Sequence, residues 1–258
     1  MRYAHSAAIR ARLAGADAPS TANKMLAALR GVLEEAWRLG YMDADTLRRA
    51  TDLPPLRGSK VPAGRDLTAG EMRAPFAVCA EDPWPAGARD AAALALCYGA
   101  LLRRAEAVAV DLADLRPDAG SITVRAGMKR RVAYASRGTW AAVDAWLAIR
   151  GTEPGPVLLP VNRAGRVVFR RLTDQALYNI VDRRRTEAQL DPISPHDFRR
   201  TCIVDLLDQG ADIATVADLA GHSNVRTTQR YDRRRERRKR TAADLVHVHF
   251  VAANSVKP

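Results

Sequence analysis

Near its C-terminus the chain reads Ser194-Pro195-His196-Asp197-Phe198-Arg199-Arg200-Thr201. A serine followed by a proline is typical of an N-cap and the first helical position, so we expect a helix to begin here. His196 and Arg199 are three residues apart and therefore lie on one face of that helix. Taken alone, this pair is compatible with a solvated or structural role as well as with a functional one.

The residues that follow predict two further helix ends and a junction. We expect Gly210 to end one helix, Asp212 to cap the next, and Gly221 to end that helix in turn. His222 is then presented at the junction, and Tyr231 follows it by nine positions. By itself, this region is also similar to the helix-turn-helix of bacterial repressors, whose second helix reads the DNA major groove.

A second motif lies upstream, directly after a segment that predicts a buried helix. It reads Tyr98-Gly99-Ala100-Leu101-Leu102-Arg103-Arg104-Ala105-Glu106 and contains an Arg-x-x-Glu pattern. With His-x-x-Arg, Gly-His and Tyr231, it forms an ordered set across residues 98–231 that resembles the signature of the tyrosine recombinases, or phage-type integrases. The resemblance covers most of the chain and is weaker before residue 65.

The resemblance implies a covalent reaction at a DNA phosphodiester. Tyr231 would attack the scissile phosphate, giving a 3′-phosphotyrosyl link and a free 5′-hydroxyl. A phenol has a pKa near 10 and needs help with its proton at neutral pH. Arg103 and Arg199 would clamp the non-bridging oxygens, where charge develops in the transition state. His196 and His222 would complete this cradle and handle the tyrosine proton.

Three neighbouring residues have assigned or competing roles. The spacing to Glu106 selects Arg103 over Arg104 as the first clamping arginine. We expect Glu106 to orient Arg103 or its helix rather than to react. Arg200 occupies a position where relatives often carry His or Arg, and is expected to support the site or to contact phosphate.

The chain departs from the family pattern at two places. Relatives usually have Gly at the position of Leu101, a change that we expect to adjust helix packing. The family also places a general-acid lysine in a β-hairpin, but the usual position here holds Ala126 or Arg125 when the turn is aligned on Gly127. An arginine does not readily surrender a proton. Either Lys129 serves as the acid through a shifted turn, or cleavage is slow and the protein is partly degenerate.

Composition independently favours a nucleic-acid partner. The 258 residues carry 41 Lys+Arg against 29 Asp+Glu, a formal net charge of +12, and all but five of the basic residues are arginine. Arginine pairs bidentately with phosphate, and a positive field attracts polyanions. A GC-rich genome would explain arginine in place of lysine, but not the surplus over acids. With 47% hydrophobic and 27% charged residues the chain is an ordinary globular one.

Other classes are excluded by simple features. Three cysteines, far apart and odd in number, do not form a disulfide scaffold or a CxxC-type zinc module. No apolar run approaches the roughly 18 residues of a membrane span, and we expect no signal peptide. We therefore expect a soluble cytoplasmic protein, associated with the bacterial nucleoid.

The fold class expected is mainly α with a small antiparallel β-sheet (α+β). Residues 1–56 predict helices, and 57–65 a basic linker rich in Pro and Gly. The resemblance implies that residues 1–56 are a core-binding domain that clamps DNA, short enough to lack some of the family's helices. It likewise implies that residues 66–258 are a catalytic domain with a C-terminal tail. Within it, 121–125 and 131–135 predict the two strands of a hairpin. Helix caps are expected at Ser20 and Thr68, with helices over 89–98, 139–150 and 172–190.

The resemblance also implies partners. They are double-stranded DNA and three further copies of the chain, forming a homo-tetramer on paired DNA sites. The apolar tail 242–250 would dock on a neighbouring protomer, and the arginine-rich segment 233–240 either contacts phosphate or is a solvated helix face. No metal, nucleotide or organic cofactor is implied. A DNA-binding regulator or architectural protein that keeps the fold but not the reaction is the alternative function.

Overall fold

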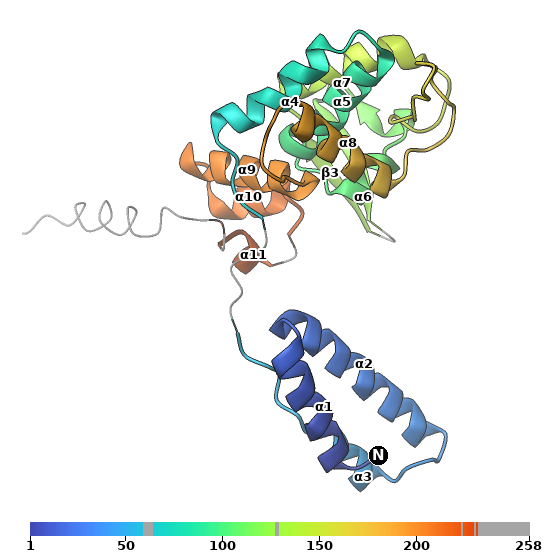
Figure 1. The fold of residues 1–258 in the computed structure, drawn as a ribbon, viewed down its shortest axis with the longest axis vertical. Helices are drawn as coiled ribbons and strands as arrows, with labels where there is room; N and C mark the ends of the chain where they lie inside the picture. Colours follow the sequence, from blue (N-terminus) through green and yellow to red (C-terminus); the bar gives the residue numbers. More distant parts are fainter. Residues whose placement is uncertain (59–63, 127–128, 223, 230, 232–258) are drawn as a thin grey trace, which may run out of the picture. The chain divides into compact units, whose positions relative to one another are not determined.

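The structure is a computed structural model that describes residues 1–58, 64–126, 129–222, 224–229 and 231, without the side chains of residues 126 and 129. The chain separates into two compact units, Met1–Ala63 and Gly64–Pro258 (Figure 1). The division falls inside the basic segment 57–65. The segments 233–240 and 242–250 lie outside the described residues.

The first unit consists of helices α1 (Tyr3–Ala16), α2 (Pro19–Arg38) and α3 (Ala44–Thr51). Its core is built on the buried α2 residues Ala22, Leu26 and Leu33. The expected cap at Ser20 is wrong, because Pro19 takes the first helical position and Ala18 becomes the N-cap.

The second unit is built around helix α5 (Pro85–Gly99), whose residues Ala92–Cys97 are all buried. Helices α4 (Ala69–Glu81), α7 (Arg137–Arg150) and α9 (Pro195–Asp208) pack against it, and α8 (Asp174–Glu187) contacts α4 (Figure 1). Thr68 caps α4 as predicted and forms a reciprocal capping box with Glu71. The helix predicted from residue 89 begins earlier, at Pro85. The helix predicted from residue 172 begins later, at Asp174, because Thr173 is its N-cap.

Within the described residues, a three-stranded antiparallel sheet has the order β1 (Leu115–Arg116), β2 (Ser121–Ala126) and β3 (Lys129–Tyr134). The predicted hairpin is present, with Val124 opposite Arg131 and Ile122 opposite Ala133. Strand β1 is too short to give a sequence pattern. The prediction of a mainly helical fold with a small antiparallel sheet is confirmed.

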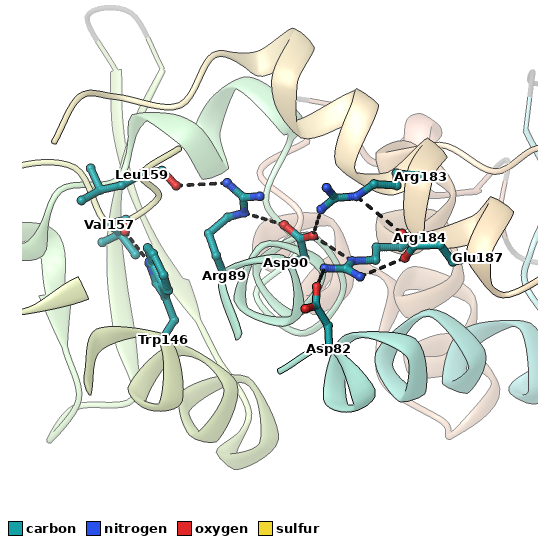
Figure 2. A network of polar contacts seen from close by, with 9 residues as sticks. All are labelled: Asp82, Arg89, Asp90, Trp146, Val157, Leu159, Arg183, Arg184 and Glu187. Carbon is teal, nitrogen blue, oxygen red and sulfur yellow. Dashed lines mark hydrogen bonds and ion pairs between the residues drawn. The ribbon is translucent and has the colours of Figure 1, made fainter. Parts of the chain in front are cut away.

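A buried polar network joins α5 to α8 (Figure 2). The carboxylate of Asp90 is fully buried and accepts hydrogen bonds from Arg89 (2.5 Å), Arg183 (2.5 Å) and Arg184 (2.8 Å). Arg184 also pairs with Asp82 and with Glu187. These ion pairs fix the register of α5 against α8.

The remaining elements carry the predicted motifs: α6 (Arg104–Ala109), the short 3-10 helix η1 (Leu112–Asp114), α10 (Ile213–Leu219) and α11 (Val225–Gln229). Gly210 and Gly221 follow α9 and α10 with positive φ angles of 97° and 61°, as expected for helix ends. Asp212 caps α10 by accepting from the Thr215 amide. Among the described helices, none combines the length and apolar character needed to cross a bilayer.

Candidate active site

The first turn of α9 is fixed by its own sequence. Ser194 is the N-cap, Pro195 takes the first helical position, and the Asp197 carboxylate accepts from the Ser194 amide (2.8 Å) and hydroxyl (2.7 Å). This capping box sets where His196 and Arg199 emerge from the helix. Both side chains face the cluster described below, as their three-residue spacing predicts.

Arg199 lies at the centre of the cluster, with 1% of its surface exposed. Its Nη1 donates to the Leu101 carbonyl, and its Nη2 donates to the Ala220 carbonyl and lies 3.2 Å from His222 Nε2. Burial, and then the charge of Arg103, lower the pKa of Arg199 to about 10. The guanidinium therefore stays charged at neutral pH and is held by carbonyls at the ends of two helices.

Arg103 approaches the same place from the N-terminus of α6. Its Nη1 pairs with Glu106 Oε1 at 2.6 Å, and its Nη2 donates to the Gly221 carbonyl at 3.1 Å. Its side chain is 45% exposed, so the guanidinium has a face open to a ligand. Arg104 points elsewhere and pairs with Asp174 at 2.8 Å. The selection of Arg103 from the Arg-x-x-Glu spacing agrees with this geometry.

Glu106 is the carboxylate that holds the arginines together. It is 5% exposed, and its Oε2 accepts from the Arg103 amide at 2.9 Å and from Arg131 Nη2 at 2.9 Å. Burial acts to raise the pKa of Glu106, but the Arg103 amide and the Arg131 charge outweigh it and hold that pKa below its usual range. Glu106 is thus an ionised anchor, which agrees with an orienting role.

His222 is neutral at physiological pH. Burial and the charges of Arg199 and Arg103 lower the pKa of His222 to about 4. Because arginine nitrogens only donate, Nε2 accepts from Arg199, and the proton on Nδ1 is donated to Thr228 Oγ1 at 2.8 Å. The pKa of His196 is lowered in the same direction by burial and by Arg199.

Tyr231 lies beside both histidines. Its hydroxyl is 3.4 Å from His196 Nε2, and its ring stacks 6.4 Å from the His222 ring, centroid to centroid. The residue is 8% exposed and packs with Leu101 and Ile203. Arg200 lies over the tyrosine ring, with 5.3 Å from Cζ to the centroid, while its Nε donates to Asp66 at 2.7 Å.

The cluster can bind an anion. Three guanidiniums, from Arg103, Arg131 and Arg199, surround one carboxylate and two neutral imidazoles, which leaves a local excess of positive charge. A hollow of about 430 Å³ opens beside it, lined by Leu102, Arg103, Arg104, Tyr178, Ser194, Pro195 and His196. The site thus has charge, donors and space for a phosphate group.

Five of the six residues selected from the sequence come together: Arg103, His196, Arg199, His222 and Tyr231. Lys129 begins β3 opposite Ala126, and its side chain lies outside the described part of the chain. Sequence reasoning missed Arg131 and Thr228. The signal for Arg131 was available, because it lies two residues before Ala133 and so on the same, buried face of a strand, where an apolar residue is expected.

Comparison with known proteins shows the family of the chain. The model of the phage integrase family matches residues 65–238, which include every element of the cluster. The chain belongs to the phage integrase family. The match also covers the arginine-rich segment 233–238 that follows Tyr231.

Relatives of this family member include bacterial recombinases. Tyrosine recombinase XerD of Mycobacterium tuberculosis is 31% identical over 221 residues, which are 82% of this chain and 68% of that protein. Tyrosine recombinase XerC of Corynebacterium glutamicum is 35% identical over 162 residues, covering 62% of this chain and 51% of the relative. The chain thus spans between half and about two thirds of the length of these relatives.

Solved structures share the fold at lower identity. The XerH site-specific recombinase bound to palindromic difH substrate superposes with a TM-score of 0.69 at 17% identity, over 95% of this chain and 72% of that one. A lambda integrase dimer bound to a COC′ core site gives a TM-score of 0.64 at 15% identity, over 100% of this chain and 84% of that one. These likenesses extend over both units.

Proposed function

We propose that this protein is a site-specific DNA recombinase that cleaves and rejoins DNA strands through a 3′-phosphotyrosyl intermediate. The observation that carries the proposal is the chain of contacts around Tyr231: its hydroxyl lies 3.4 Å from His196 Nε2, and its ring stacks beside His222, which Arg199 contacts. A repressor would have no use for a buried tyrosine in that setting. The family relatives named tyrosine recombinases support the same reaction.

In the proposed reaction the Tyr231 oxygen attacks the scissile phosphorus. The P–O bond to the 5′-oxygen breaks as the P–O bond to tyrosine forms, so the bond energy is kept for the reverse reaction. The phenolic proton needs an acceptor, and neutral His196 is within reach of it. Attack by the 5′-hydroxyl of a partner strand then releases Tyr231 and joins the strands.

The arginines would stabilise the negative charge that develops on the non-bridging oxygens. Arg199 is immobilised by the Leu101 and Ala220 carbonyls, so its guanidinium needs little reorganisation during the reaction. Arg103 is held on one edge by Glu106 and is exposed on the other. His222 is fixed by Thr228 and points its Nε2 at the same cluster.

Departure of the 5′-oxygen requires a proton, and we assign it to Lys129. The lysine begins the strand that also carries Arg131, whose guanidinium reaches Glu106. Lys129→Ala is expected to slow cleavage of ordinary DNA and to cleave DNA with a 5′-thiolate leaving group at the wild-type rate, since a thiolate leaves without a proton. Unchanged cleavage of both substrates by the variant would contradict the assignment.

The partners proposed are duplex DNA and further copies of the chain. Residues 1–56 would clamp the DNA together with the catalytic domain 66–258, joined by the linker 57–65. A homo-tetramer on paired sites would be held by exchange of the tail 242–250. The net charge of +12 supports binding of a polyanion. The place proposed for this binding is the nucleoid, in the cytoplasm.

A nicked duplex that loses a short 5′-hydroxyl fragment after cleavage tests the proposal. The wild type is expected to accumulate a covalent protein–DNA adduct that survives denaturation, and Tyr231→Phe is expected to bind the DNA but form none. DNA binding without any adduct would favour the alternative, a regulator on the same fold. An adduct that persists in Tyr231→Phe would refute the choice of nucleophile.

A further inference from the structure

Arg131 lies on the buried face of the sheet, where an apolar side chain is expected. It stands opposite Val124 on β2, and the same face carries Ile122 and Ala133, all at most 1% exposed. The Arg131 side chain is 18% exposed. Burying a guanidinium is costly unless its hydrogen bonds are replaced, so a specific set of partners is expected.

Those partners lie on two other elements. Arg131 Nη2 donates to Glu106 Oε2 at 2.9 Å, and Nη1 donates to the carbonyl of Leu219, the last residue of α10, at 3.1 Å. The same Glu106 carboxylate holds Arg103 through its side chain and its amide. One planar guanidinium therefore connects the hairpin to the N-terminus of α6 and to the C-terminus of α10.

The turn that carries His222 is also built around Arg131. Gly221 has a φ of 61°, and a Cβ on it would lie 2.6 Å from both Cδ and Nε of Arg131. The backbone can approach the arginine this closely only because Gly221 has no side chain. The carbonyl of Gly221 in turn accepts from Arg103 Nη2 at 3.1 Å.

We propose that Arg131 is a positioning residue of the active site, an inference that rests on the proposed function. Through Glu106 it sets the orientation of Arg103, and through Leu219 and Gly221 it sets the turn that presents His222. It also couples these groups to strand β3 of the hairpin, which begins at Lys129. Its role needs two donors in a fixed fork, which arginine has and lysine lacks.

The test is single-turnover adduct formation at saturating nicked DNA, with the affinity for DNA measured separately. Arg131→Gln is expected to lower the cleavage rate at saturation by about 10²-fold, because a shift of about 1 Å in reacting groups has that effect. Its dissociation constant for DNA should change by less than about threefold. Arg131→Lys, which keeps the charge, should remain slow.

Arg130→Gln is the matched control. It removes the same charge from the neighbouring strand position, which is exposed and opposite Arg125. Its cleavage rate at saturation should stay within about twofold of the wild type. If Arg130→Gln and Arg131→Gln are slowed equally, general charge loss explains both effects and the positioning role is refuted.

Two further variants and the wild type separate the positioning role of Arg131 from the proposed recombinase function. If Arg131→Gln does not fold, Arg131→Lys decides, and a wild-type rate in that variant overturns the requirement for a fork. Gly221→Ala, which pushes a methyl group against the same guanidinium, should lower the rate at saturation as well. Absence of an adduct in the wild type would instead refute the proposed function itself.

Discussion

At Leu101 the backbone takes a left-handed conformation, with φ of 55°, that residues with a side chain rarely adopt. The conformation turns the Leu101 carbonyl to Arg199, and the side chain packs in the cluster that contains Tyr231. The strain of about 1–2 kcal/mol would be absent with glycine, the residue that the resemblance implies at this position. The sequence marks Leu101 as a departure, but its conformation is set by contacts distant in sequence.

Leu101→Gly should therefore cost less stability than Leu102→Gly. Both leucines are buried, with 4% and 0% exposed, so each loses a similar apolar contribution. Only Leu101→Gly relieves the strained φ, which should make its loss in free energy of unfolding smaller by about 1–2 kcal/mol. Denaturant unfolding of both variants measures this, and an equal or greater loss for Leu101→Gly would contradict the account.

His222 should make stability depend on pH. Its pKa is about 4 in the folded protein, below the ordinary value of 6.5, so between these values the unfolded chain binds the extra proton. Stability is therefore complete above pH 6.5 and is lost as the pH falls toward 4. The free energy of unfolding should drop less between pH 7 and pH 5 in His222→Gln. A drop identical to that of the wild type would show that His222 is not responsible.

At the scale of elements, local signals set the helix ends. Thr68, Ser194 and Asp212 cap the helices that they predict, because each bond joins residues three apart in the sequence. Contacts between elements left no such signal. The pairing of Asp90 with Arg184 depends on the packing of α5 on α8, and only the strand period of two could have pointed Arg131 inward.

Asp90 should be one of the residues most sensitive to substitution in the core of the second unit. Asp90→Asn removes the counter-charge of the buried Arg89 guanidinium and one of the three carboxylates that pair with Arg184, which should cost about 3–5 kcal/mol of stability. Asp182→Asn on the same helix as Arg184 removes a more exposed pair with Arg185 and should cost less than about 1 kcal/mol. Urea unfolding compares them, and similar losses would contradict a structural role for the network.

At the scale of the whole molecule, the predictable part was the order of the motifs. His196, Arg199, His222 and Tyr231 lie within one run of helices, and Arg103 comes from the N-terminus of α6, more than 90 residues earlier in the chain. Their spacing along the chain indicated the family, and the fold places them together. The net charge of +12 predicts in addition that affinity for DNA falls steeply with salt, since bound phosphates release counterions.

The central claim is that the phenolic oxygen of Tyr231 forms the covalent bond between the protein and DNA. The most direct measurement is mass spectrometry of the peptides released from the trapped adduct on nicked DNA. We predict one nucleotide-bearing peptide, modified at Tyr231 through a 3′-phosphate. A modification at any other residue, or a 5′-linked nucleotide on Tyr231, would contradict the account.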